Sequence, residues 1–293
     1  MPVPVSIIPG LSAIAPRYDV LLCDVWGVIH NGREAFPGVV ECLSQARTGG
    51  RTVVLLSNSP RPSEGVKSQL ESFGVPRDSY SGVVTSGDLT QALFAERTAG
   101  GRAFKVYHIG PDRDSPLYDG SSVARVTLAQ ADAIVCTGPF DDTTEGPEDY
   151  RELWGRALAL RLPFICANPD LVVQRGDRLI YCAGALAKLY EEMGGEVLYL
   201  GKPHAPVYDF AARRLVELTG HPVPRNKWLA IGDGLKTDIL GATRAGVDAL
   251  LIAGGIHEQE FSDASGAPDP TRIAQILDRD GLKIVAAMRR LVW

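Results

Sequence analysis

The chain has 293 residues, a formal net charge of −5 at pH 7, 45% hydrophobic residues and 22% charged residues. These values are typical of a soluble globular protein that forms one large domain or two ordinary ones. The weakly negative charge argues against a broad nucleic-acid-binding face but is compatible with a small pocket for an anionic metabolite. The chain also lacks the run of roughly 20 apolar residues that crosses a membrane.

The cysteines and the N-terminal segment predict a cytoplasmic protein. The cysteines form no CxxC pair, and three of them lie in apolar runs, which indicates small buried thiols in a reducing compartment. The N-terminal segment MPVPVSIIPGLSAIAPR has no early Lys or Arg and is interrupted by prolines, so a secretory signal is not expected. The five cysteines are Cys23, Cys42, Cys136, Cys166 and Cys182.

Short β-branched runs alternate with longer amphipathic stretches, which predicts an α/β fold with parallel sheets and crossover helices. The expected strands, in chain order, are Val20–Cys23, Thr52–Leu56, Phe104–Ile109, Ala133–Cys136, Phe164–Cys166, Val197–Leu200, Trp228–Ile231 and Ala249–Ile252. The expected helices between them are Gly38–Thr48, Ser63–Phe73, Tyr150–Leu160, Ala183–Met193, Pro206–Thr219 and Lys236–Ala245. The C-terminal stretch LKIVAAMRRLVW (282–293) is expected to form an amphipathic helix that covers the core sheet.

Polar residues follow four of the predicted strands at the point where each strand ends. These residues are Asp24, Ser57 with Asn58, Lys202 after Gly201, and Asp233. Each of them alone could be a helix cap or a turn residue. Because ligands of parallel sheets bind outside the carboxyl ends of the strands, the set together predicts a reaction centre for a phosphate group and a divalent cation.

The spacing of these strand ends predicts an inserted domain. Ser57 and Lys202 are separated by 145 residues, whereas the other neighbouring strand ends are 31 and 33 residues apart. The excess contains its own predicted strands and helices and has the size of an ordinary small domain. We therefore expect residues 1–82 and 183–293 to form the core and residues 83–182 to form an insertion.

Five motifs together resemble the haloacid-dehalogenase (HAD) superfamily of phosphohydrolases: CDVWGVIHNG, LLSNSPR, CANPD (166–170), GKPHAPVYDFA and IGDGLKTDILGA. The order of the motifs is similar to the class that carries a large α/β cap between the second and third motifs. That class includes NagD-like, nucleotide, pyridoxal-phosphate and phosphoglycolate phosphatases. The resemblance implies a Rossmann-like parallel-sheet core, a smaller inserted α/β cap that closes as a lid and selects the leaving group, and a homodimer.

The resemblance also implies roles around a Mg²⁺ ion. Asp24 would be the nucleophile that attacks phosphorus and forms an aspartyl-phosphate. The carboxylates of Asp24 and Asp233 and the backbone carbonyl of Trp26 would bind Mg²⁺. Asp238 would hold a metal-bound water or orient Lys202. Oxygen ligands of this kind are those that Mg²⁺ prefers.

Further residues would bind the phosphate group and the leaving group. Ser57, the backbone of Asn58 and Gly27 would contact the phosphate oxygens, and Lys202 would neutralise the developing charge. Contacts of the cap with the substrate are expected from the turn after Val84, the Thr137–Pro139 turn and the CANPD segment. The candidates in the cap are Ser86, Asn168 and Asp170.

Trp26 departs from the pattern of this superfamily, in which the residue two places after the nucleophile is an aspartate that acts as general acid and base. The indole has a single N–H and no accessible acid–base chemistry. General acid–base catalysis contributes about 10²–10⁴-fold, or about 3–5 kcal/mol of barrier. His30 or His204 could supply the missing proton, or His30 could be an ordinary surface histidine in the turn before Asn31.

Two hypotheses follow for the function. The first is a Mg²⁺-dependent phosphatase of a small phosphorylated metabolite, slow or restricted to good leaving groups. The second is a non-catalytic protein that senses or stores a phosphorylated ligand in the same pocket. The retained nucleophile Asp24 favours the enzyme, because a binding protein has no need of a carboxylate aimed at phosphorus. Dehalogenation is disfavoured because Asp233 and Asp238, which that chemistry does not require, are both present.

Overall fold

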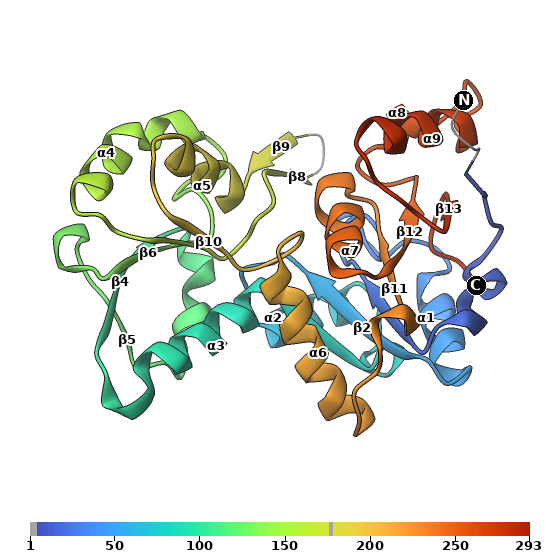
Figure 1. Cartoon of the computed structure of the whole chain (residues 1–293), viewed down its shortest axis with the longest axis horizontal. Coiled ribbons are helices and arrows are strands. Elements are labelled where there is room, and N and C mark those ends of the chain that lie inside the picture. Colours follow the sequence, from blue (N-terminus) through green and yellow to red (C-terminus); the bar gives the residue numbers. More distant parts are fainter. Residues whose placement is uncertain (1–4, 176–177) are drawn as a thin grey trace. The chain divides into compact units, whose positions relative to one another are not determined.

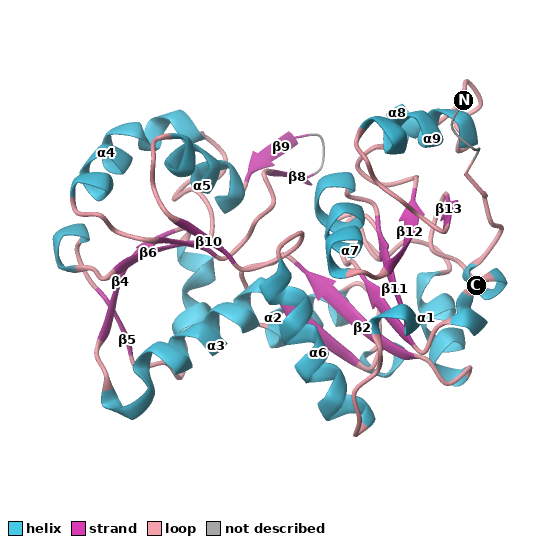
Figure 2. Ribbon diagram, in the orientation of Figure 1, coloured by secondary structure: helices cyan, strands magenta, loops and turns pink. Residues whose placement is uncertain are grey.

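The computed structural model describes residues 5–175 and 178–293, which form two compact units. The first unit comprises Met1–Ser57, Lys67–Val84 and Tyr208–Trp293, and the second comprises Asn58–Val66 and Thr85–Val207. Each unit has a sheet of its own with helices packed against it (Figure 1, Figure 2). Among the described residues, no helix has the length and apolar character needed to cross a membrane.

The first unit contains a six-stranded sheet with the order β13-β12-β11-β1-β2-β3. The strands are β1 (Val20–Cys23), β2 (Thr52–Ser57), β3 (Gly82–Thr85), β11 (Trp228–Gly232), β12 (Asp248–Ile252) and β13 (Ala286–Met288). The pairs β1–β2, β1–β11, β11–β12 and β12–β13 are parallel. All residues of β1 and β11 are buried, as expected for central strands covered on both faces.

Helices of the first unit cover this sheet by burying one apolar stripe each. In α1, Val39, Cys42, Leu43 and Ala46 are buried, which is the spacing of one helical face. The helices that lie wholly or partly in the first unit are α1 (Val39–Thr48), α2 (Ser63–Ser72), α6 (Ala205–Thr219), α7 (Leu240–Ala245), α8 (Glu258–Phe261) and α9 (Pro270–Arg279). A π-helical turn, Leu235–Ile239, precedes α7 where the sequence predicts an uninterrupted helix.

The second unit contains a five-stranded sheet with the order β10-β7-β6-β4-β5, in which every pair is parallel. Helices α4 and α5 lie on one face of this sheet and α3 lies on the other (Figure 2). Trp154 meets both Phe164 and Tyr190 edge to face in the core between α4, α5 and the sheet. The elements are α3 (Ser86–Thr98), β4 (Phe104–Ile109), β5 (Val123–Arg125), β6 (Ala133–Cys136), α4 (Arg151–Ala159), β7 (Phe164–Cys166), the antiparallel hairpin β8 (Val172–Arg175) and β9 (Arg178–Tyr181), α5 (Ala183–Glu192) and β10 (Val197–Tyr199).

The strand before Lys202 belongs to the second unit and not to the core sheet, where the sequence places it. Strand β10 pairs with β7, with Val197 opposite Phe164, and α5 packs against both strands. Contacts therefore extend the second unit to Val207, beyond the predicted boundary at residue 182, and also include residues 58–66. A short apolar strand suits either sheet, and only its hydrogen-bonded neighbour decides between them.

The helix predicted for residues 282–293 is wrong. Ala286–Met288 form β13 at the edge of the six-stranded sheet, and all three residues are buried. The N-terminal segment flanks the strand: the Ile8 N–H donates to the Ala287 carbonyl at 2.9 Å, and the Ala287 N–H donates to Ser6 at 2.9 Å. An apolar run of this length is too short to distinguish a buried strand from a buried helix. The prediction that the five cysteines are buried is confirmed, and none of them forms a disulfide among the described residues.

Candidate active site

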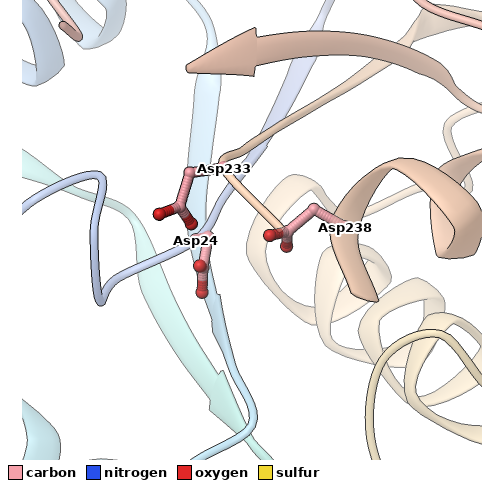
Figure 3. Close-up of side chains that lie close together, drawn as sticks. All are labelled: Asp24, Asp233 and Asp238. Atoms are coloured by element: carbon pink, nitrogen blue, oxygen red, sulfur yellow. The ribbon is translucent and has the colours of Figure 1, made fainter. Parts of the chain in front are cut away.

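Three carboxylates meet at the carboxyl edge of the six-stranded sheet (Figure 3). Asp24 follows β1, Asp233 follows β11, and Asp238 lies in the π-helical turn. Each carboxylate offers one oxygen, and these oxygens all lie within 4.8 Å of one another. Strands β1 and β11 are parallel neighbours, and the Asp24 N–H donates to the Ile231 carbonyl at 2.8 Å, so both strands deliver their acids to the same edge.

Backbone hydrogen bonds hold the two acids that follow β11. The Ile256 N–H donates to Oδ2 of Asp233 at 2.8 Å, and the Gly234 N–H donates to Oδ2 of Asp238 at 3.0 Å. Both carboxylates are buried, so these charge-assisted bonds are stronger than they would be in water. They fix the direction of each side chain before any ligand binds.

Three glycines make room for the same two carboxylates. A Cβ atom at Gly27 or at Gly255 would overlap Oδ2 of Asp233, and a Cβ atom at Gly232 would overlap the carboxyl group of Asp238. Gly27 also has a φ of +82°, a conformation that favours glycine, and its N–H donates to the His30 carbonyl at 2.9 Å. Gly27 therefore makes space for the Asp233 carboxylate, and the phosphate contact that the resemblance implies for it stays a prediction. Sequence reasoning missed Gly255, which no local motif marks.

The donor set fits a hard divalent cation. Three carboxylates this close together repel one another strongly when they are partly or fully buried, and a cation between them offsets that repulsion. Mg²⁺ and Ca²⁺ prefer oxygen ligands of this kind. The residues that the sequence selected as metal ligands, Asp24, Asp233 and Asp238, are therefore brought together.

The loop after Asp24 packs the Trp26 indole against His30. Their rings meet edge to face at 5.2 Å, and the His30 ring meets Phe73 at 5.0 Å. Gly32, with a φ of +88°, lies directly against the far edge of the indole, where a Cβ atom would come within 2.5 Å of a ring carbon. The position that usually carries an acid is thus occupied by a ring that forms part of the loop's own core.

His30 is buried, with 2% of its surface exposed, so the interpretation as a surface histidine is wrong. The Gly32 N–H donates to Nδ1 of His30 at 2.9 Å. Because Nδ1 accepts, the neutral ring carries its proton on Nε2. The sequence signal for a turn at Asn31–Gly32 was correct, but the aromatic partners that bury His30 lie elsewhere in the chain. His204 stacks on Tyr199 at 4.5 Å, a contact made within the second unit.

Three of the predicted residues meet within the second unit. The Asn58 side chain accepts the Lys202 N–H at 2.8 Å, donates to the Lys202 carbonyl at 3.0 Å and donates to Oδ1 of Asp170 at 2.8 Å. Asn58 and Lys202 are each 3% exposed. Asn58 follows Ser57, the last residue of β2, which is 8% exposed. The second motif and the motif around Lys202 are therefore linked through one side chain.

The remaining cap candidates are distributed differently. Ser86 starts α3 and is fully buried, so it is not in a position to contact a ligand from solvent. Asn168 is 8% exposed, and its Oδ1 accepts the Asp170 N–H at 3.2 Å, which shapes the CANPD turn. Of these candidates, Asp170 makes the contact that bears on Lys202.

A polar cluster that sequence reasoning found only in part, through the Thr137–Pro139 turn, lies near the carboxyl ends of β4 and β6. Nε2 of His108 lies 3.3 Å from the Thr137 hydroxyl, and the buried Asp114 carboxyl also bonds to Thr137. Burial lowers the pKa of His108 to about 4 and raises the pKa of Asp114. The rule that selected Asp24, a polar residue just beyond a strand, does not reach Asp114, because β4 already ends at Ile109.

Comparison with known proteins supports the resemblance drawn from the motifs. A family model described as haloacid dehalogenase-like hydrolase matches residues 21–120, and a second HAD-hydrolase-like model matches residues 199–279. The structure of a haloacid dehalogenase-like hydrolase from Brucella suis is 43% identical, covers 98% of this chain and 100% of that chain, and superposes with a TM-score of 0.84. This chain belongs to the haloacid dehalogenase-like hydrolases. The predicted family and the α/β fold class are confirmed.

Other relatives of this HAD-like hydrolase carry names of phosphatases. The ribonucleotide monophosphatase NagD of Escherichia coli is 25% identical over 83% of this chain and 91% of its own length. The glycerol phosphate phosphatase of Mycobacterium tuberculosis, solved in complex with calcium, is 26% identical, covers 83% of this chain and 68% of that chain, and has a TM-score of 0.63. These relatives share the fold and span most of the chain, but their substrates differ from one another.

Proposed function

We propose that this HAD-like hydrolase is a Mg²⁺-dependent phosphatase of a small phosphorylated metabolite. The observation that carries the proposal is the cluster of Asp24, Asp233 and Asp238 oxygens within 4.8 Å of one another at the edge of a parallel sheet. The named relatives, which act on phosphate esters, support the same reaction class. A divalent cation bound among these carboxylates would screen the repulsion between an attacking carboxylate and a phosphate dianion.

Asp24 is the proposed nucleophile, and Asp233 with the Trp26 carbonyl completes the ligand set. The Asp24 backbone is fixed by its hydrogen bond to Ile231, so its carboxylate is held at the strand end. It would attack phosphorus to form an aspartyl-phosphate while the P–O bond to the leaving group breaks, and water would then hydrolyse the aspartyl-phosphate to release inorganic phosphate and restore Asp24. Asp238, held by the Gly234 N–H, would orient a water ligand of the ion.

Binding of the phosphate group is assigned to Ser57, the backbone of Asn58 and Lys202. Ser57 is the last residue of β2, and its hydroxyl can donate to a phosphate oxygen. The Lys202 ammonium offsets the negative charge that develops during transfer. The buried position of both side chains favours strong interactions with a bound anion.

Trp26 restricts which substrates this enzyme can turn over quickly. Its indole supplies no proton to a departing alkoxide, and its contacts with His30 and Gly32 hold it in the loop. The favoured substrates are therefore those whose leaving group departs without a proton, such as acyl phosphates, which release a carboxylate, and activated aryl phosphates, which release an aryloxide.

We further propose that the second unit, which contains most of the predicted insertion and also Ala183–Val207, is the cap, and that its closure excludes water and selects the leaving group. The resemblance to capped phosphatases supports this role. The same resemblance supports assembly into a homodimer. The buried thiols favour a reducing compartment such as the cytoplasm.

A phosphate-release assay tests the proposal. The wild-type protein is incubated with acyl, aryl and alkyl phosphates in the presence of Mg²⁺ or excess EDTA, beside the Asp24→Asn variant. We expect release that requires Mg²⁺ and is abolished in Asp24→Asn. If no substrate releases phosphate while phosphorylated ligands bind at millimolar concentration or better, the protein is a sensor rather than an enzyme.

A further inference from the structure

The side chain of Asn58 makes two hydrogen bonds to the backbone of one residue, Lys202. Its Oδ1 accepts the Lys202 N–H at 2.8 Å, and its Nδ2 donates to the Lys202 carbonyl at 3.0 Å. This is the exchange that two residues make in a hydrogen-bonded pair of strands, here with a side-chain amide in place of one strand. Two hydrogen bonds to the backbone of Lys202 fix the orientation of that backbone and hence the position of its Cα and Cβ atoms.

Asp170 completes the network. The second proton of Nδ2 goes to Oδ1 of Asp170 at 2.8 Å, so both amide protons of Asn58 have acceptors. The Asp170 backbone is in turn held by Oδ1 of Asn168 at 3.2 Å. The network is largely buried, which strengthens each bond and makes the loss of any partner costly.

The residue before Lys202 provides independent evidence that this arrangement is tightly fitted. A Cβ atom at Gly201 would lie 2.6 Å from Oδ1 of Asn58 and 2.7 Å from the Pro169 ring, and it would overlap the Ser86 hydroxyl. Only glycine lets the chain approach the amide this closely. The amide, the CANPD turn and the glycine before Lys202 are therefore mutually fitted.

We propose that Asn58 is a positioning residue that sets the Lys202 ammonium for phosphoryl transfer, with Asp170 orienting the Asn58 amide. This inference rests on the proposed function for the role of Lys202, but it assigns the Asn58 side chain a task distinct from the phosphate contact of its backbone. A charge that must meet developing negative charge is sensitive to displacement, and misplacement by about 1 Å can cost about 100-fold in rate.

The test exchanges the two partners. Asn58→Asp keeps an acceptor for the Lys202 N–H, loses the donor to the Lys202 carbonyl and places two carboxylates together. We expect kcat to fall about 10- to 100-fold. In the double variant Asn58→Asp with Asp170→Asn, the new amide donates to the new carboxylate, and kcat should recover at least about fivefold relative to Asn58→Asp. Asn58→Ala tests the same loss without an added charge if Asn58→Asp does not fold.

Tyr190→Phe is the matched control in the same unit. It removes one buried hydrogen bond from a side chain to a backbone carbonyl, that of the Tyr190 hydroxyl to Leu162 at 2.6 Å. It should lower the thermal midpoint while leaving kcat unchanged. The inference is overturned if Asn58→Ala keeps kcat within about threefold of wild type, if the exchange restores nothing, or if Tyr190→Phe loses as much kcat as Asn58→Asp.

A binding measurement separates failure of this inference from failure of the proposed function. If the wild type hydrolyses no substrate, binding of inorganic phosphate is measured by calorimetry in the same variants. Binding that weakens about 10-fold or more in Asn58→Asp and recovers in the double variant supports the positioning role without catalysis. Equal binding in all variants, or none in the wild type, overturns it.

Discussion

Replacing Trp26 by aspartate should change the enzyme's dependence on the leaving group. The substitution places a carboxyl group two residues after the proposed nucleophile Asp24, where it can protonate a departing alkoxide and then activate water. We expect kcat/KM for alkyl phosphates to rise about 10²–10⁴-fold, which corresponds to about 3–5 kcal/mol of barrier. For aryl phosphates with acidic leaving groups, kcat/KM should rise far less, because the aryloxide departs without a proton.

The same substitution carries a cost in stability. The indole meets His30 edge to face at 5.2 Å and covers Gly32, and it is only partly exposed. Removing a fully buried Trp costs about 3–5 kcal/mol, so for this partly exposed ring we expect a somewhat smaller loss in the free energy of unfolding, about 2–4 kcal/mol. Trp26→Asn leaves nearly the same space without an acid and separates this cost from the catalytic gain.

The assay compares kcat/KM across a series of phosphate esters whose leaving groups span a wide range of pKa. Wild type and Trp26→Asn should show a steep dependence on leaving-group pKa, and Trp26→Asp a shallow one. Identical slopes for Trp26→Asp and Trp26→Asn would show that the missing acid does not limit the reaction, and the account of Trp26 given above would be refuted.

Three further predictions concern stability and the metal. Gly255→Ala should lower the free energy of unfolding by about 1–3 kcal/mol and weaken Mg²⁺ binding in calorimetry, because the new methyl group overlaps the Asp233 carboxylate. The control Gly155→Ala, in the open interior of α4, should raise the free energy of unfolding by about 0.5–1 kcal/mol. Burial lowers the pKa of His108 to about 4, so as pH falls below 6.5 the unfolded chain binds this proton before the folded protein does. Between pH 7.5 and pH 5, urea titrations should therefore show the wild type losing about 2 kcal/mol more free energy of unfolding than His108→Gln. The raised pKa of Asp114 is common to both proteins. Mg²⁺ at about 100 times its Kd should stabilise the wild type by about 2.7 kcal/mol in thermal unfolding and should have little effect on Asp233→Asn.

Much of the candidate site could be predicted from local patterns. An apolar run that ends in an acid, as at Cys23–Asp24, indicates a buried strand that delivers a carboxylate to its carboxyl end, and the same reasoning found Asp233. These signals work because alternation, burial and strand ends depend on neighbours in the chain. The glycines of the CDVWG and IGDG motifs likewise carried a local signal, although it did not reveal which carboxylates they accommodate.

Other features depended on which segments meet in space. Strand β10 joins the sheet of the second unit through β7, and Ala286–Met288 join β12, although both short runs suit several environments. The burial of His30 required Phe73, and the placement of Lys202 depends on an amide 144 residues away in the chain. Chain-local periodicity by itself determined the acids of the site and the strands that carry Asp24 and Asp233. Only the tertiary structure decided the partners, because hydrogen bonds and packing between distant segments leave no periodic trace in the sequence.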